Sequence, residues 1–297
     1  MNESLPPVLF GFFCWWFGTG LVFLLDRLLR GRGAAARALI VGLGAASLLA
    51  IAASSGVVEP WGAYLGFGAS IALWGALELS FLTGWLTGPR TSACPGGCRG
   101  WRHFGHAVMA LLHHELALVA GALAVAALCW DRPNPTAAWT YAVLWVLRES
   151  AKLNLFLGVR NSAAELLPPR LSHLAAFFGK RRVNALLPVS IAAAAAVDAI
   201  LIRAAVSPAA TPLLRSAELM LATLLALAIV EHLVLVLPVR ADALWTWATK
   251  RGQTRTPQTP PRGSLKTGLR TAPAVVPAVV PAVVPTVLAH GAPAKPL

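Results

Sequence analysis

The chain alternates between long apolar runs and short polar breaks. A helix needs about 20 residues to cross the hydrocarbon core of a bilayer, and the longer apolar runs reach that length. Strings such as EPWG, DRPNP and SPAATP separate the runs and are typical of helix ends. The predicted spans are residues 7–26, 37–58, 62–86, 104–129, 136–158, 186–206 and 213–238. The pattern therefore predicts an all-α, polytopic bundle of seven transmembrane helices.

Basic side chains collect in alternate loops between these runs. The richer loops contain Arg27, Arg30, Arg32 and Arg37; Arg90, Arg99 and Arg102; and Arg160, Arg170, Lys180, Arg181 and Arg182. Loops rich in Lys and Arg stay on the cytoplasmic side of a membrane. We therefore expect the N-terminus to be periplasmic and the C-terminus to be cytoplasmic.

The composition agrees with a membrane protein. The chain is 57% hydrophobic and 12% charged, whereas soluble domains carry about 25% charged residues. The formal net charge is +13, but seven of the 25 Lys and Arg residues lie after residue 249 and most others lie in loops. Membrane topology accounts for this distribution, so we do not expect a nucleic-acid partner.

Two segments are not predicted to span the membrane. In 163–184, apolar residues recur at helical spacing beside a KRR cluster, which favours a short interfacial cytoplasmic helix near 170–182. A solvated loop is the alternative. The tail, 249–297, contains APAVVPAVVPAVVP, and proline at that density predicts an extended, disordered segment after a membrane domain of residues 1–248.

Cys94 and Cys98 form the string CPGGC, and His103 and His106 follow. Thiolates and imidazoles are zinc ligands, so a zinc site is one interpretation. The spacing matches no standard ligand pattern, however, and a Gly/Pro-rich turn is the simpler explanation.

Polar residues in four spans reach a common depth. Ionisable groups inside spans are rare and are functional candidates by default. At about 1.5 Å per residue, these groups lie roughly 6 to 16 Å below the cytoplasmic boundary. The layer consists of Glu78, His113, His114, Glu115, Arg148, Glu149, Lys152, Asn154, Glu231 and His232. Consecutive helical residues lie about 100° apart, so we expect Glu115 and one of the two adjacent histidines to face inward, toward Glu78 and Glu231.

Three interpretations of this layer remain open. It can be an ion-pair and hydrogen-bond network that fixes helix packing. It can be a metal site, as in di-metal helix bundles, with candidate ligands Glu78, His113, His114, Glu115, Glu231 and His232. It can also contact a tetrapyrrole through a neutral imidazole. No phosphate loop, dinucleotide fingerprint or nucleophile elbow occurs, and no catalytic residue is assigned.

Four strings carry a family resemblance. WGALELSFLTGWLTGPR (74–90), LLHHELAL (111–118), LWVLRESAKLNLFLGVRN (144–161) and EHLVLVLP (231–238) resemble the PuhE family of purple phototrophic bacteria, a family of photosynthetic complex assembly proteins. The resemblance covers most of residues 5 to 248. One departure is Leu77, where the family leads us to expect a histidine.

The resemblance implies a membrane assembly factor for the photosynthetic reaction centre and light-harvesting complex, which assists bacteriochlorophyll supply or insertion. It implies the bacterial inner (photosynthetic, intracytoplasmic) membrane as location. The expected partners are the lipid bilayer, reaction-centre or light-harvesting subunits and other assembly factors. We expect a non-enzymatic role. The alternative is an intramembrane metal-dependent enzyme that acts on a lipid-soluble or tetrapyrrole substrate. Bacteriochlorophyll and a di-metal centre are the corresponding cofactor candidates.

Overall fold

The computed structural model describes residues 4–95, 98–162, 164 and 167–237, which form seven α-helices, one 3₁₀ helix and no strand. The predicted tail, 249–297, lies outside the described residues. The elements are α1 (Leu5–Leu28), α2 (Gly33–Ser55), α3 (Pro60–Leu82), α4 (Gly100–Cys129), α5 (Thr136–Leu157), η2 (Pro169–Phe177), α6 (Leu186–Ala205) and α7 (Pro212–Val234).

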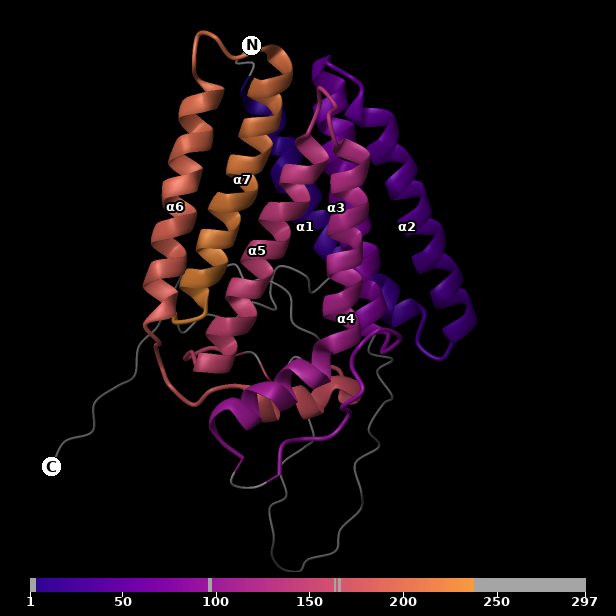
Figure 1. The fold of residues 1–297 in the computed structure, drawn as a ribbon, viewed down its shortest axis with the longest axis vertical. Coiled ribbons are helices and arrows are strands. Elements are labelled where there is room, and N and C mark those ends of the chain that lie inside the picture. Colours follow the sequence, from indigo (N-terminus) through magenta and orange to yellow (C-terminus); the bar gives the residue numbers. More distant parts are fainter. Residues whose placement is uncertain (1–3, 96–97, 163, 165–166, 238–297) are drawn as a thin grey trace, which may run out of the picture.

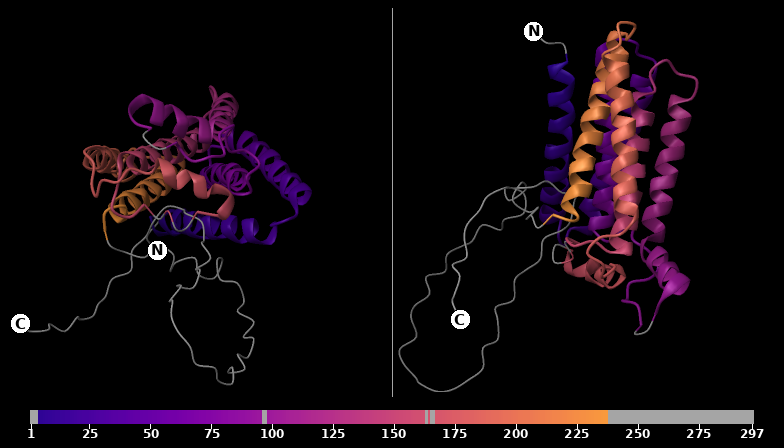
Figure 2. Two further views of the ribbon diagram at one scale, coloured as in Figure 1. Left: turned by 90° about the horizontal axis from the view of Figure 1, so that it is seen from below. Right: turned by 90° about the vertical axis from the view of Figure 1, so that its left-hand side faces the viewer.

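The α-helices run side by side, and the chain passes back and forth along the bundle (Figure 1). Helix α3 packs against α1, α2, α4, α5 and α7 and is therefore central. The connections α1–α2, α3–α4 and α5–α6 lie at one end, and α1 begins at the opposite end. The basic loops of the sequence are thus gathered at a single end of the bundle, which is the lower end in Figure 1 and in the right-hand view of Figure 2.

Six of these helices are long and apolar enough to cross a membrane: α1, α2, α3, α4, α6 and α7. The protein is therefore a multi-pass membrane protein. Helix α5 is not among the six, and its second half carries Arg148, Glu149 and Lys152. Seven spans and the direction of insertion stay predictions.

The helix ends depart from the predicted spans by three or four residues at five places: α2 begins at Gly33 and ends at Ser55, α4 begins at Gly100, and α3 and α7 end early. The predicted span 62–86 extends past the end of α3 at Leu82, because Gly84 adopts a φ of +78°. This left-handed conformation suits glycine and cannot continue a helix. The predicted span 213–238 likewise extends past the end of α7 at Val234. The polar residues that matter below lie inside the helices in both cases.

Two buried asparagines join helix ends that are distant in sequence. Asn134 donates from its side chain to the Ser54 carbonyl at 3.0 Å and so ties the start of α5 to the end of α2. Asn184 donates to the carbonyls of Asn154 and Gly158, at 3.2 and 3.0 Å, and ties the start of α6 to the end of α5. Buried polar groups need such partners, so these bonds help to fix the position of α5.

The 3₁₀ helix η2 docks on the lower end of the bundle (Figure 2). Residues three apart share a face in a 3₁₀ helix, and Leu171, Leu174 and Phe177 are accordingly buried in the core. Arg170 pairs with the buried carboxylate of Asp26 and donates to the Leu82 carbonyl. The predicted interfacial helix near 170–182 is therefore a shorter segment with a 3₁₀ spacing, and it packs on the protein.

Candidate functional site

The centre of the candidate site is a set of ion pairs from α5 to its neighbours. Arg148 Nη2 lies 3.0 Å from Glu78 Oε2 on α3. Lys152 Nζ lies 2.6 Å from Glu115 Oε1 on α4 and 2.8 Å from Glu149 Oε1 on its own helix. The side chains are partly buried, so each cation satisfies carboxylates that would otherwise be costly inside the bundle.

On the opposite face of α5, the contacts are uncharged. Ser150 Oγ lies 2.9 Å from His232 Nε2, and His232 Nδ1 lies 2.8 Å from the Ala228 carbonyl. Because a carbonyl only accepts, the imidazole proton is on Nδ1 and the Ser150 hydroxyl donates to Nε2. Asn154 donates to the Ser150 carbonyl at 2.9 Å and to Ser190 Oγ on α6 at 3.3 Å.

Glu231, next to His232 in the sequence, has a different partner. Trp15 Nε1 of α1 donates to Glu231 Oε1 at 2.9 Å. The indole N–H is a donor only, so this bond orients the carboxyl group of α7 toward α1. Trp15 was not among the predicted site residues, and no local pattern marks it as the partner of Glu231.

The two adjacent histidines of α4 have opposite environments. His113 is exposed on the protein surface, whereas His114 is 1% exposed. Neither ring nitrogen of His114 has a hydrogen-bond partner among the described residues. Its ring centroid lies 4.7 Å from that of Phe81. A buried imidazole without a polar partner is uncommon, and it marks His114 as the most unusual group of the layer.

The α3–α4 loop makes backbone contacts with α4 beside His114. The His114 N–H donates to the Thr87 carbonyl at 2.9 Å, and the Arg90 N–H donates to the Met109 carbonyl at 3.3 Å. A Cβ on Gly88 would lie 2.2 Å from the Met109 carbonyl oxygen, so only glycine allows this approach. Insertion of outside groups into a helical ladder bends a helix, and Figure 1 shows the first turns of α4 inclined to the rest.

Two cavities meet at Arg148. The first, of about 180 Å³, lies toward α1 and α7, and the second, of about 230 Å³, lies toward α4 and η2. The polar side chains of the first are Trp15, Thr19, Glu78, Arg148, Glu231 and His232. Those of the second are His114, Glu115, Arg148, Glu149 and Lys152. Most of the remaining lining is apolar, as is usual in small-molecule sites.

The structure thus divides the predicted layer. Glu78 and Glu231 line one cavity, whereas His114 and Glu115 line the other. His113 and Asn154 line neither. Among the described residues, the layer contains no group of three His, Cys, Asp or Glu side chains close enough to share a metal ion. Its carboxylates Glu78 and Glu115 are instead paired with cations.

A family model described as a protein of unknown function (DUF3623) matches residues 1–256. The chain belongs to the DUF3623 family. It is 37% identical over 252 residues to a Rhodobacter capsulatus protein named "Uncharacterized 30.4 kDa protein in puhA 5'region", and the match covers 83% of this chain and 91% of that relative. No solved structure matches the chain. The DUF3623 match includes every helix described above and both cavities.

Proposed function

We propose that this DUF3623 protein is a PuhE-type assembly factor for the photosynthetic reaction centre and light-harvesting complex. Two findings support the proposal. The strings at 74–90, 111–118, 144–161 and 231–238 resemble that family. The Rhodobacter capsulatus relative takes its name from the region of the gene puhA, which is a photosynthesis-gene context. The chain would act in the inner, photosynthetic membrane, beside subunits of these complexes.

The observation that carries a pigment-handling role is His114. It is buried, has no hydrogen-bond partner among the described residues, and lines the cavity between α4, α5 and η2. A neutral imidazole is an axial ligand for the metal of a tetrapyrrole. Phe104, Phe156 and Phe178 supply apolar walls. We therefore infer that this cavity receives part of a bacteriochlorophyll as cargo, with His114 facing the pigment metal.

The ion pairs fit this assignment. Arg148 and Lys152 line the same cavity and already have carboxylate partners. The site is therefore close to charge balance before any ligand enters, which favours a neutral, lipid-soluble ligand over an anion. A volume of about 230 Å³ is below the range of about 300–1,000 Å³ typical of sites for whole small molecules. The rest of the pigment would lie in the adjoining membrane.

The proposed topology has seven spans, with a periplasmic N-terminus and a cytoplasmic C-terminus. Helix α5 connects the two ends of the bundle and lies against α3, α4, α6 and α7 (Figure 1). Its charges pair inside the protein, which reduces the cost of placing them in a membrane. The arginine-rich connections share one end, as expected of the cytoplasmic side.

The test is a gene deletion in a phototrophic host, complemented with paired variants. We expect the deletion to lower the levels of reaction-centre and light-harvesting complexes during phototrophic growth. Wild type and His113→Phe should restore them, whereas His114→Phe should not, although the membrane should contain similar amounts of each protein. Pigment absorbance should copurify with wild type and with His113→Phe and should be lost from His114→Phe.

Unchanged complex levels in the deletion strain would overturn the assembly role. Full complementation by His114→Phe, with pigment still bound, would instead overturn the role of His114 and leave the assembly role standing. His113→Phe is a matched control for His114→Phe, because both variants replace a histidine by phenylalanine in the same turn of α4.

A further inference from the structure

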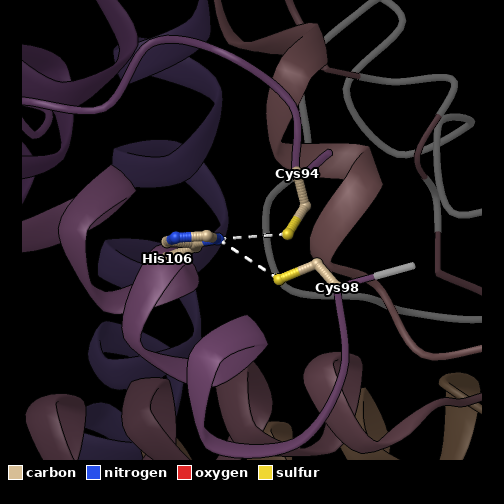
Figure 3. A group of neighbouring side chains, drawn as sticks. All are labelled: Cys94, Cys98 and His106. Carbon is tan, nitrogen blue, oxygen red and sulfur yellow. Dashed lines mark hydrogen bonds between the residues drawn. The ribbon is translucent and has the colours of Figure 1, made fainter. Parts of the chain in front are cut away.

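A second polar cluster is separate from the ion pairs of Arg148 and Lys152. It lies where the α3–α4 loop meets the first turns of α4. Cys94 Sγ and Cys98 Sγ lie 3.2 and 3.3 Å from His106 Nδ1 (Figure 3). The ligand atoms of these three residues all lie within 4.8 Å of one another, and both cysteines are free thiols. All three side chains are partly buried.

These separations match a shared metal ion. Zinc binds cysteine sulfur at about 2.3 Å and histidine nitrogen at about 2.0–2.1 Å, so tetrahedral geometry separates the two ligand atoms by roughly 3.6 Å. The observed sulfur–nitrogen distances differ from that value by only a few tenths of an ångström. The Cys98 N–H donates to the Pro95 carbonyl at 3.2 Å, which holds Cys98 near the chain segment that carries Cys94.

His103 is a candidate fourth ligand beside the group of three, although only Cys94, Cys98 and His106 have all their ligand atoms within 4.8 Å of one another. It is three residues before His106 on α4, so the two imidazoles share a face of the helix. Its Nδ1 lies 3.3 Å from Cys94 Sγ. The His103 ring lies against Phe156 and Phe177, at centroid distances of 5.5 and 5.6 Å, and both phenyl rings line the cavity that contains His114.

Two arginines lie near the cluster. Arg90 and Arg102 act electrostatically on both Cys94 and His106. A divalent cation beside two arginines requires compensating negative charge, which two thiolates and neutral imidazoles supply. Sulfur and imidazole ligands in a tetrahedral set select zinc over calcium or magnesium, which prefer oxygen.

We propose that Cys94, Cys98, His103 and His106 form a structural zinc site. Four protein ligands leave no open position, which is the arrangement of structural rather than catalytic zinc. The ion would fasten the α3–α4 loop to the first turns of α4. The contacts of Thr87, Gly88 and Arg90 lie further along the same helix, at Met109 and His114. Through His103, it would also hold one wall of the cavity. This inference does not depend on the proposed function.

The test is the metal content of full-length protein purified from membranes in a zinc-containing medium, without added chelator. We expect about one zinc per chain in wild type. The double variant Cys94→Ser/Cys98→Ser and the single variant His106→Ala should lose it, and His103→Ala should weaken zinc binding by about tenfold or more. The matched control is Cys14→Ser/Cys129→Ser, which removes the other two cysteines and should keep the zinc.

Cobalt gives a second measurement if the variants are poorly produced. Stripped wild-type protein titrated with Co²⁺ should develop thiolate-to-metal absorption, which needs no mutant. Zinc should also protect two of the four thiols from alkylation. Less than a tenth of a zinc per chain in wild type, as an order of magnitude, would overturn the proposal. So would zinc retained by the Cys94→Ser/Cys98→Ser variant, or a disulfide between the two cysteines in protein alkylated directly in the membrane.

Discussion

The two faces of α5 solve the problem of burying polar groups in different ways. Toward α3 and α4, Arg148 and Lys152 form ion pairs and line a cavity. Toward α6 and α7, Ser150 and Asn154 form neutral hydrogen bonds. Positions two residues apart differ by about 200° around a helix. The two chemistries therefore lie on opposite sides of the same stretch of helix.

The difference has energetic consequences. Removal of one partner from an ion pair leaves a charge that no nearby group compensates, and the cost is large. Removal of a neutral hydrogen bond between membrane helices costs much less, because the groups left behind are uncharged. Arg148 lines both cavities and Lys152 lines one of them, whereas Ser150 and Asn154 line neither. We therefore assign ligand contact to the charged face and helix packing to the neutral face.

The largest expected effect is at Arg148. Arg148→Met leaves Glu78 without its cation and should lower the free energy of unfolding by about 3–5 kcal/mol. Adding Glu78→Gln should restore most of this loss, since it removes the uncompensated charge. Denaturant unfolding in detergent measures both variants. Equal stability of Arg148→Met and wild type would show that the pair does not constrain the fold.

On the neutral face, Asn154→Leu should cost about 1–2 kcal/mol, because it removes the bonds to the Ser150 carbonyl and Ser190 Oγ. The same unfolding experiment applies. The control is Ser190→Ala, which removes only the interhelical partner and should cost less than Asn154→Leu. A loss as large as that of Arg148→Met would contradict the distinction between the two faces.

Lys152 belongs to the charged face, but its partners Glu115 and Glu149 are 25% and 37% exposed, against 14% for Glu78, so its loss should be smaller than that of Arg148. Lys152→Met should destabilise by about 1 kcal/mol, since its pairs are partly open to the surroundings and such pairs contribute little. The loss should shrink at high salt. Denaturant unfolding at low and high ionic strength measures this change in stability. Arg148→Met is the comparison, and its loss of stability should depend less on salt.

The smallest expected effects are at the adjacent histidines. His113→Phe should change stability by no more than about 0.5 kcal/mol, as expected of an exposed position. His114→Phe should be close to neutral in stability as well, because it removes a buried imidazole that forms no hydrogen bond with the described residues. Thermal unfolding of the pigment-free proteins measures both. A large loss at His114 alone would indicate a packing role in place of ligand contact.

Much of the architecture could be predicted from local pattern. Apolar length located all seven α-helices, and the breaks between them were correct to within a few residues at most ends. One of the larger departures, at residue 86, arose because a left-handed glycine ends α3 although apolar residues continue. Counting residues from the cytoplasmic boundary predicted that polar residues of α3, α4, α5 and α7 lie at a common depth, since the rise per residue is the same in every α-helix.

The candidate site was less predictable. The sequence gives the angle between His113 and His114 but not the rotation of α4 about its axis, which depends on packing against α3 and α5. The partner of Glu231 is Trp15, which lies 216 residues away in the chain. No local pattern connects these two residues. The separation of the layer into two cavities follows from the position of α5 between its neighbours.

The sequence by itself determined where helices form, which helices carry charge and which connections are basic, because these properties depend on neighbouring residues and on fixed helical geometry. Only the tertiary structure decided which charges meet, that His114 is buried while His113 is exposed, and that Cys94 and Cys98 lie beside His106. The last point depends on the path of the α3–α4 loop: Gly88 permits its close approach to α4, but no local pattern identifies Met109 and His114 as its backbone partners.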